Sequence, residues 1–331
     1  MCAELVSIVI VNYNGAHWLP RCLESLHAQT YADVEIVLVD NASSDDSVAV
    51  VTTSHPSVHI VKSPTNIGFA AGNALGIEAA RGAWIILINS DTWVATTLVA
   101  DLLVEKEARG LDVIGPREAD YESGVALPPY RSSIDRLGHP VKRPSTHADA
   151  DDESFYITGV CLLFARSLYI ETRGLDPGFF MYNEEVDWFW RLILLRKSFS
   201  YSRTTLVYHA GAGSSGTGLL SSIFLWRNEN TLQMLLKNYS LRTLAWALPL
   251  YLLSNVFEVF GLAATGHWDL AVTYPLGWRF NVQHIRRIRG ERAWVQSRRQ
   301  LSDREVMVRM YRGWGKAHHL RQRILARTPQ P

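Results

Sequence analysis

Short apolar runs alternate with helical segments through the first third of this chain of 331 residues. Residues 6–11, 34–39 and 84–88 are rich in Val, Ile and Leu, as expected of strands that are buried on both faces of a sheet. Between them, residues 17–29 place apolar side chains at helical spacing, and residues 69–80 are rich in alanine. This alternation predicts an α/β fold with a mainly parallel sheet flanked by helices.

The remaining elements follow the same patterns, with one interruption. Residues 116–153 are dominated by prolines, glycines and charged residues, and so long an irregular stretch is typical of a lid or an inserted loop. Residues 239–331 form a second region, which is apolar at first and then rich in arginine. Further strands are expected at residues 58–61, 155–164 and 206–208, and further helices at residues 47–53, 96–109, 185–195, 223–238 and 244–264.

Polar side chains stand at the point where each apolar run ends. In open α/β folds, ligands bind at the carboxyl ends of the strands. Neither a glycine-rich dinucleotide fingerprint nor a Walker-type motif follows the first run, so a dinucleotide and P-loop ATP hydrolysis are not expected. The polar residues are Asn12 after the first run, Asp40 and Asn41 after the second, and Asn89 and Asp91 after the third. For Asn12 an ordinary turn is an equally good explanation.

Two segments that lead into predicted helices, residues 40–45 and 66–73, each have two explanations. Residues 43–45 are good N-caps for the next helix, but capping does not explain Asp40, and a carboxylate or amide there can read the edge of a pyrimidine. Asn66, Gly68 and Asn73 surround a second helix start. Backbone N–H groups at such a start attract phosphate, and small residues would let it approach closely. Tight packing of the helix on the sheet explains the same small residues.

Asp91 and His209 are candidate metal ligands. Mg²⁺ and Mn²⁺ take oxygen ligands, often only one or two carboxylates, with phosphate oxygens completing the shell. Asp91 lies just beyond a buried run, with Asn89 beside it, and His209 lies between a predicted strand and the glycine-rich residues 211–216. The alternatives are a turn residue for Asp91 and a structural role for the histidine.

Three acids occur within four residues at the start of a predicted helix. The helix dipole favours acids at this end, which explains at least one of them. Asp187 and Arg191 stand four residues apart and are expected to pair along the helix. Glu185 is then the candidate general base, with Glu184 as its rival. The aromatic residues Phe179, Phe180 and Tyr182 before them could form the floor of a sugar pocket.

Composition indicates the cellular location of the protein. Three cysteines without motif spacing fit a reduced cytosolic protein and exclude a disulfide framework or a zinc cluster. The opening residues lack the basic start of a signal peptide, so we expect a cytoplasmic protein. The net charge of +1 hides an asymmetry, because residues 279–331 hold fourteen Lys or Arg against three acids.

Residues 244–264 are long and apolar enough to resemble a transmembrane helix, but Pro249, Asn255 and Glu258 argue against a clean span. With the basic tail behind it, an in-plane segment on an anionic membrane surface is the better interpretation, which places the protein peripherally on the inner face of the cell membrane. An ordinary helical subdomain, or a homodimer contact through this region, is the alternative. No nucleic-acid partner is expected.

Seven blocks in fixed order give the chain a family resemblance. Together they resemble the inverting family-2 glycosyltransferases of GT-A fold, a Rossmann-like class, and in particular the rhamnosyltransferase-like branch. The resemblance implies that residues 1–238 form a GT-A domain for nucleotide-sugar binding and catalysis. The blocks are residues 6–15, 39–45, 66–73, 87–92, 159–164, 174–191 and 209–215.

The resemblance also implies roles for individual residues. Asp91 matches the last acid of the family's metal-binding motif, and Asn89 replaces the usual first acid. Glu185 stands where the family usually has an aspartate as the base, and this extra methylene leaves Glu184 as a rival. His209 matches a histidine that completes the metal or diphosphate site. The remaining expected donor-site residues are Asn12, Asp40, Asn41, Asn66, Gly68 and Asn73.

The implied activity is metal-dependent, inverting transfer of a sugar from a dTDP- or UDP-type donor. The resemblance suggests L-rhamnose from dTDP-rhamnose, a glycan or polyprenyl-linked acceptor, and a place in cell-envelope polysaccharide synthesis. Two alternatives stay open. One is a catalytically inactive nucleotide- or glycan-binding module, and the other is a sugar-phosphate nucleotidyltransferase, whose basic glycine-rich opening loop is missing here.

Overall fold

The computed structural model describes residues 4–144, 154–211 and 220–317. Each strand predicted in the first third is present, and each runs to or beyond its last apolar residue. The strands in the described residues are β1 (Val6–Asn12), β2 (Val34–Asp40), β3 (His59–Lys62), β4 (Trp84–Asn89), β5 (Thr92–Val94), β6 (Val113–Asp120), β7 (Tyr130–Ile134), β8 (Pro140–Pro144), β9 (Cys161–Ala165) and β10 (Phe199–His209).

The predicted helices are also present, with ends that shift by a few residues. The chain adds α5 and a set of helices after residue 265. The helices in the same part of the chain are α1 (Leu19–His27), α2 (Ser47–Ser54), α3 (Gly68–Ala79), α4 (Leu98–Ala108), α5 (Arg166–Thr172), α6 (Glu184–Leu194), α7 (Leu220–Asn238), α8 (Leu241–Ala264), α9 (Trp268–Ala271), α10 (Thr273–Gln283), α11 (Ile285–Arg298) and α12 (Asp303–Met307).

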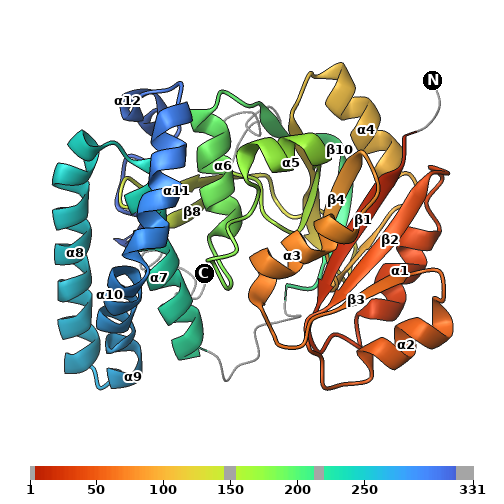
Figure 1. The fold of residues 1–331 in the computed structure, drawn as a ribbon, viewed down its shortest axis with the longest axis horizontal. Coiled ribbons are helices and arrows are strands. Elements are labelled where there is room, and N and C mark those ends of the chain that lie inside the picture. Colours follow the sequence, from red (N-terminus) through yellow and green to blue (C-terminus); the bar gives the residue numbers. More distant parts are fainter. Residues whose placement is uncertain (1–3, 145–153, 212–219, 318–331) are drawn as a thin grey trace, which may run out of the picture.

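The main sheet has eight strands in the order β3-β2-β1-β4-β9-β6-β10-β5, and β7 and β8 form a separate hairpin. Strands β1 to β4 are parallel, as predicted, whereas β9 runs antiparallel between β4 and β6. Asn12 pairs with Asp40, and Val11 with Asn89. This register brings the polar residues that end the strands to one edge of the sheet (Figure 1).

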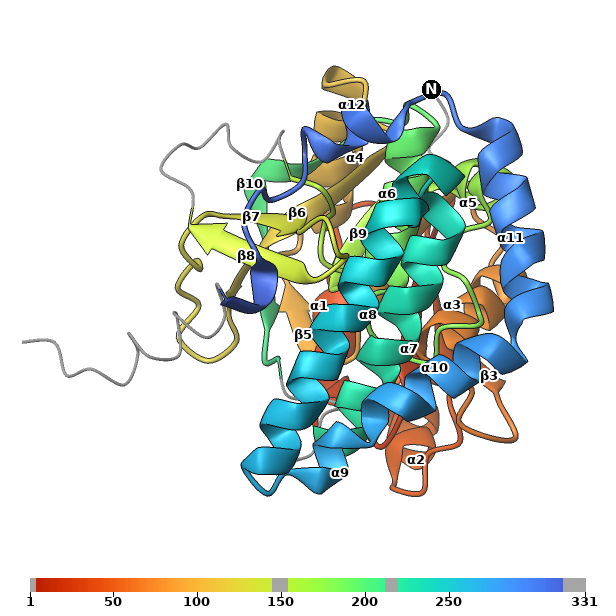
Figure 2. The ribbon, with the colours of Figure 1, turned by 90° about the vertical axis from the view of Figure 1, so that its left-hand side faces the viewer.

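Helices cover both faces of the sheet, because alternate residues of each strand point to opposite sides. Ile8 and Ile10 of β1 join an apolar cluster with α1, α2 and α4. Val9 faces the other way, into a larger cluster that contains Trp188 of α6 and also Val295 of α11. The C-terminal helices therefore share a core with the sheet, and they stand together at one end of the molecule (Figures 1 and 2).

Residues 116–144 differ from the expected lid or loop. Strand β6 continues to Asp120, and β7 and β8 pair antiparallel as a hairpin. The prediction failed because β6 contains Pro116 and charged residues, a pattern that is not typical of a buried strand. Residues 145–153 of the expected loop lie outside the described residues. The strand expected at residues 155–164 is also shorter, since β9 begins only at Cys161.

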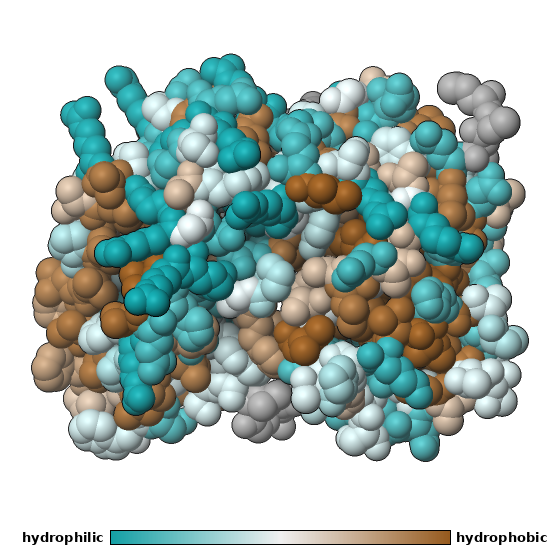
Figure 3. Space-filling model, in the orientation of Figure 1, coloured by the Kyte–Doolittle hydropathy of each residue, from teal (hydrophilic) through white to brown (hydrophobic). Residues whose placement is uncertain are grey.

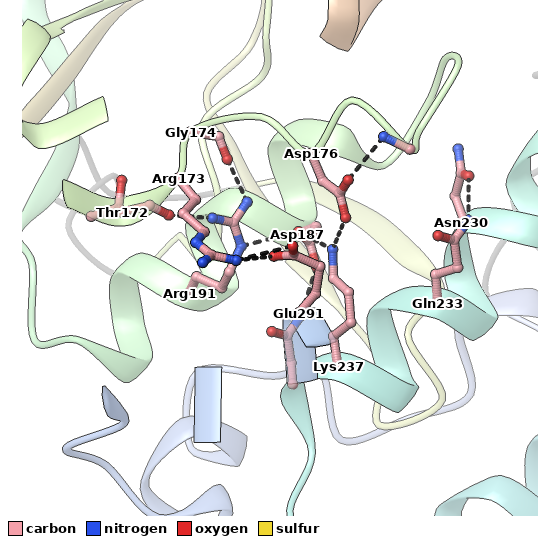
Figure 4. A network of polar contacts seen from close by, with 12 residues as sticks. Thr172, Arg173, Gly174, Asp176, Asp187, Arg191, Asn230, Gln233, Lys237 and Glu291 are labelled. Carbon is pink, nitrogen blue, oxygen red and sulfur yellow. Dashed lines mark hydrogen bonds and ion pairs between the residues drawn. The ribbon is translucent and has the colours of Figure 1, made fainter. Parts of the chain in front are cut away.

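A buried network of charges ties α6 to the C-terminal helices (Figure 4). Lys237 Nζ of α7 lies 2.5 Å from Asp176 Oδ2 and 2.9 Å from Asp187 Oδ2. Arg191 pairs with Asp187 at 3.1 Å, as predicted, and Arg287 of α11 pairs with Asp176 at 2.8 Å. Burial alone would raise the pKa of Asp176, but the charges of Lys237 and Arg287 hold it well below its ordinary value.

We predict that Lys237→Met destabilises the protein by about 3–5 kcal/mol, because it leaves two buried carboxylates without their shared cation. The midpoint of urea unfolding measures the loss. Lys197→Met is the matched control, since Lys197 pairs with Glu171, whose side chain is more than half exposed, and such pairs contribute about 0–1 kcal/mol. Equal losses in the two variants would contradict the prediction.

Candidate active site

A cavity of about 350 Å³ opens where β1, β4 and β10 end, and we call it the sheet-edge cavity. Among the predicted site residues it brings together Asn89, Asp91, Glu184, Glu185 and His209. The sequence had placed these five in three separate motifs that span 120 positions. The cavity is completed by Val11, Phe69, Ser90, Glu118, Lys142, Tyr156, Thr158, Gly159, Val160, Met181, Tyr182 and Gly211.

His209 lies between two carboxylates of this cavity. Its Nε2 is 3.4 Å from Asp91 Oδ1, and its Nδ1 is 3.5 Å from Glu118 Oε2. Burial alone would lower the pKa of His209, but the hydrogen bonds and charges of the two carboxylates outweigh it and raise the pKa to about 9. The two carboxylates therefore stabilise the protonated ring, and a metal that binds through Nε2 would displace its proton. Residues 212–215 of its sequence block lie outside the described residues.

Glu118 is a site residue that the sequence analysis missed. It is buried, and it accepts hydrogen bonds from Tyr130 Oη at 2.5 Å and Thr158 Oγ1 at 2.8 Å. Burial alone would raise the pKa of Glu118, but His209, Lys142 and these donors lower it to about 2. Its position in a stretch interpreted as a loop concealed it, and no spacing in the sequence links it to Asp91.

Two amides at strand ends hold buried oxygen atoms without a partner among the described residues. They are Oδ1 of Asn12 and Oδ1 of Asn89. The amide nitrogen of Asn12 donates to Ser43 Oγ at 3.2 Å, which fixes the side chain but leaves its oxygen unpaired. A buried oxygen without a hydrogen bond costs about 1–3 kcal/mol, and a ligand that donates to it would recover this free energy.

The segment around Asp40 and Asn41 is held by its own hydrogen bonds and does not line the sheet-edge cavity. Asp40 Oδ1 accepts from the N–H of Ser43 at 3.2 Å. Asn41 donates to Asn66 Oδ1 at 3.0 Å and accepts from the N–H of Ile67 at 2.9 Å. Both side chains are buried at the end of β2, which pairs with β1. Their contact with a nucleotide stays a prediction.

The start of α3 shows tight packing. Gly68 has φ +83°, and a Cβ atom there would lie 2.2 Å from the carbonyl oxygen of Phe180. The N–H of Phe69 donates to that same oxygen at 2.7 Å. Gly72 and Gly76 pack equally closely on Val11 and Val9 of β1, and Asn73 donates to the carbonyl of Phe69 at 2.9 Å. These contacts favour packing over phosphate binding for Gly68 and Asn73.

Glu185 lies between two cavities. The second, also about 350 Å³, lies among β8, α6, α7, α8 and α10, and we call it the helix-side cavity. Glu185, Lys142, Tyr156 and Tyr182 line both cavities, whereas Glu184 lines only the sheet-edge cavity. A carboxylate in this position can reach two ligands at once.

The turn before α6 is strained. Tyr182 and Asn183 have φ of +70° and +67°, a conformation that is unfavourable for a bulky side chain. Asn230 of α7 holds the turn by donating to the carbonyls of Met181 at 2.9 Å and Tyr182 at 2.7 Å. Strained backbone of this kind is typical of functional sites, and here it directs the first turn of α6 toward both cavities.

The two adjacent glutamates have different surroundings. Burial, followed by the charge of Glu185, raises the pKa of Glu184 well above its ordinary value. Burial also raises the pKa of Glu185, but nearby Lys142 and Arg227 oppose this rise. The charges of Lys142 and Arg227 therefore favour the carboxylate form of Glu185. Asp187 takes no part, since Lys237, Arg191 and Asn238 occupy its oxygens.

The donor atoms of the site fit a divalent cation with few protein ligands. Asp91 Oδ1 and His209 Nε2 are close enough to bind one ion, and the unpaired Asn89 oxygen belongs to the same cavity. The described residues contain no group of three His, Cys, Asp or Glu side chains suited to a metal. Such a cation would therefore need phosphate oxygens to complete its shell, which is the usual pattern for Mg²⁺.

The family comparison agrees with this arrangement. The profile of Glycosyl transferase family 2 matches residues 7–188, which is more than half of the chain, and the chain belongs to this family. The matched stretch contains the strand-end residues of β1, β2 and β4, Glu118 and the first turn of α6. It stops before His209 and before the C-terminal helices that line the helix-side cavity.

Curated relatives match part of the chain. Glycosyltransferase GlyG of Streptococcus pneumoniae is 30% identical over 123 residues, which are 36% of this chain and 41% of that protein. A PGL/p-HBAD biosynthesis glycosyltransferase of Mycobacterium bovis is 33% identical over 147 residues, which are 41% of this chain and 55% of that protein. The chain thus spans about half of these relatives or less.

Solved structures share the fold at low identity. GalNAc-T7, solved with UDP, GalNAc and Mn²⁺, matches 71% of this chain and 48% of its own with a TM-score of 0.57 and 18% identity. Mannosyltransferase PcManGT from Pyrobaculum calidifontis, solved with GDP-Man and Mn²⁺, matches 89% of this chain and 86% of its own with a TM-score of 0.52 and 15% identity. The mixed sheet with flanking helices is consistent with a GT-A fold.

We predict that Asp91→Ala weakens Mn²⁺-dependent binding of a nucleoside diphosphate at least tenfold, because it removes the one predicted carboxylate ligand. Calorimetric titration with UDP or dTDP, with and without Mn²⁺, measures the effect. Asp33→Ala is the control, since Asp33 is exposed before β2 and far in sequence from the site residues. Binding by Asp91→Ala that still responds to Mn²⁺ as in the wild type would show that the metal lies elsewhere.

Proposed function

We propose that this protein transfers a sugar, with inversion, from a nucleoside diphosphate donor to an acceptor hydroxyl. The observation that carries the proposal is the position of Glu185 on the boundary of two cavities. The sheet-edge cavity, with Asn89, Asp91 and His209, suits a donor that carries phosphates. The helix-side cavity suits the acceptor, because an acceptor must meet the donor at the base.

The donor-side residues bind and orient the leaving group. Asp91 and His209 would hold Mg²⁺ or Mn²⁺ together with the diphosphate, and the metal would supply positive charge where the leaving group becomes negative. Asn12, Asp40, Asn41 and Asn66 lie where a base and ribose would reach the ends of β1 and β2. Gly68 and Asn73 shape this wall through their packing.

Glu185 acts as the general base. The acceptor oxygen forms a bond to the anomeric carbon as the bond from that carbon to the diphosphate oxygen breaks on the opposite face, and Glu185 takes the hydroxyl proton. Lys142 and Arg227 oppose the rise in its pKa that burial causes, and so favour the carboxylate that a general base requires. Burial and the charge of Glu185 raise the pKa of Glu184, which makes it the weaker candidate for the base. Tyr182, which lines both cavities, can contact the sugar between them.

The donor and acceptor are proposed only as classes. The resemblance suggests dTDP-rhamnose, and the named relatives do not specify rhamnose. GDP-Man and UDP occur in structures that share the fold. One relative is named a succinoglycan biosynthesis protein of Rhizobium meliloti, which agrees with an acceptor that is a glycan or a polyprenyl-linked glycan. Thermal-shift measurements with dTDP-, UDP- and GDP-sugars plus Mn²⁺ test which nucleotide binds.

A catalytically inactive module for nucleotides or glycans is the second candidate function, favoured by Asn89 and Glu185 at positions where the family usually has Asp. Slow hydrolysis of the donor in the absence of acceptor separates the two. An enzyme releases nucleoside diphosphate at a rate that depends on Glu185 and on metal, whereas a binding module releases none. A nucleotidyltransferase would instead produce pyrophosphate from a nucleoside triphosphate.

We predict that Glu185→Gln lowers kcat by roughly 10²–10⁴ while the donor still binds, because the amide keeps the shape and removes only the base. Glu184→Gln, the neighbouring control, should reduce kcat much less, since Glu184 does not line the helix-side cavity. Calorimetry checks donor binding in both variants. The opposite order of effects would assign the base to Glu184.

A further inference from the structure

Helix α8 has two different faces. Its inward face carries Tyr251, Asn255 and Glu258, and Tyr251 and Asn255 are almost completely buried. Its outward face carries a row of large apolar side chains at spacings of three and four residues, and we call them the outer stripe. Its members are Trp246, Leu250, Leu253, Phe257 and Phe260, and the last two are 67% and 69% exposed. Apolar colour accordingly covers the end of the molecule where α8 lies (Figure 3).

Two polar residues of α8, Asn255 and Glu258, make contacts inside the protein. Glu258 pairs with Lys316 at 2.6 Å and accepts a hydrogen bond from Tyr274, and Lys316 also donates to Asn255 at 3.3 Å. In the described residues α8 is the one helix long and apolar enough to cross a membrane. Because its inner face belongs to the shared core and holds these contacts, the helix lies along the protein rather than leaving it.

Four arginines stand at the N-terminal end of the outer stripe. A groove of about 830 Å³ there is lined by Arg136, Arg242, Arg304 and Arg312, and it also contains Trp246 of the stripe. None of the four arginines has an ion-pair partner in the described part of the chain. The acid of the groove, Asp303, is already paired with Arg299 at 2.5 Å. We call this set the arginine groove.

We propose that the outer stripe and the arginine groove form one docking surface for an anionic lipid bilayer, on which α8 lies in the plane of the membrane. An apolar face bordered by cations and tryptophan suits the boundary between acyl chains and negative headgroups. Exposed Trp268, Val272 and Leu276 extend the apolar surface past the end of α8. The proposal does not depend on the activity proposed above.

Charge favours a bilayer over a second copy of this chain. A symmetric dimer through the outer stripe would bring the stripe against itself, and the stripe contains no acid that could pair with the four arginines of the partner. An anionic bilayer can contact the outer stripe through its acyl chains and the arginine groove through its headgroups. Tyr251, on the inner face of α8, lines the helix-side cavity, so this cavity lies directly behind the docking helix.

Flotation with vesicles tests the proposal on the full chain. The wild type should bind vesicles of phosphatidylcholine and phosphatidylglycerol, bind pure phosphatidylcholine more weakly, and be partly released by salt, which screens only the electrostatic share. Leu253→Glu and Phe257→Glu should each weaken binding roughly tenfold or more, because each removes one large apolar side chain from the bilayer. Val104→Glu is the control, since Val104 is 70% exposed on α4, away from α8.

Arg242→Glu and Arg304→Glu should weaken binding to the anionic vesicles and leave binding to phosphatidylcholine unchanged. Lys62→Glu, at an exposed position of β3, is the charge control. Thermal unfolding midpoints equal to that of the wild type confirm that each variant is folded. Absence of wild-type binding, wild-type binding by the stripe variants, resistance to carbonate extraction, or a dimer that the stripe variants dissolve would each overturn the proposal.

Discussion

Lys237 and the two aspartates that share it determine where the candidate base lies. Asp176 precedes α6, Asp187 lies in its first turns, and the cation between them comes from α7. Arg191 of α6 pairs with Asp187, and Arg287 of α11 pairs with Asp176, which neutralises the remaining negative charge. Because burying an unpaired charge is so costly, these helices cannot shift independently. The start of α6, which carries Glu185, is thereby fixed to the C-terminal third of the chain.

The site is consequently larger than the stretch that the family profile matches. Residues 7–188 contain the strand ends and the two glutamates. The histidine between the carboxylates, the cation near the base and the amide that clamps the strained turn all come later, as His209, Arg227 and Asn230. A catalytic domain that ended at the matched stretch would retain the motifs and lose the contacts that position them.

The sequence indicated part of the candidate site through the strand ends. Asn89 and Asp91 follow the clearly apolar β4, and they line one cavity with His209, which ends β10. Glu118 was not predictable, since its strand is polar and its partners come from the hairpin and from Thr158. The antiparallel direction of β9 between β4 and β6 was also not predictable, because no local sequence pattern indicates it. For α8, composition indicated an apolar helix, but only the fold shows that Asn255 and Glu258 face inward.

Glu184 has a consequence for how such a chain changes over evolutionary time. One of its carboxyl oxygens is buried without a partner in the described residues, beside a second carboxyl whose pKa is also raised. Such an arrangement lowers the free energy of unfolding, so random substitution at either position would tend to produce a sturdier protein. Proteins of this family that had lost the activity would be expected to replace these acids early. We therefore expect the two adjacent acids to persist only where the proposed role of Glu185 persists.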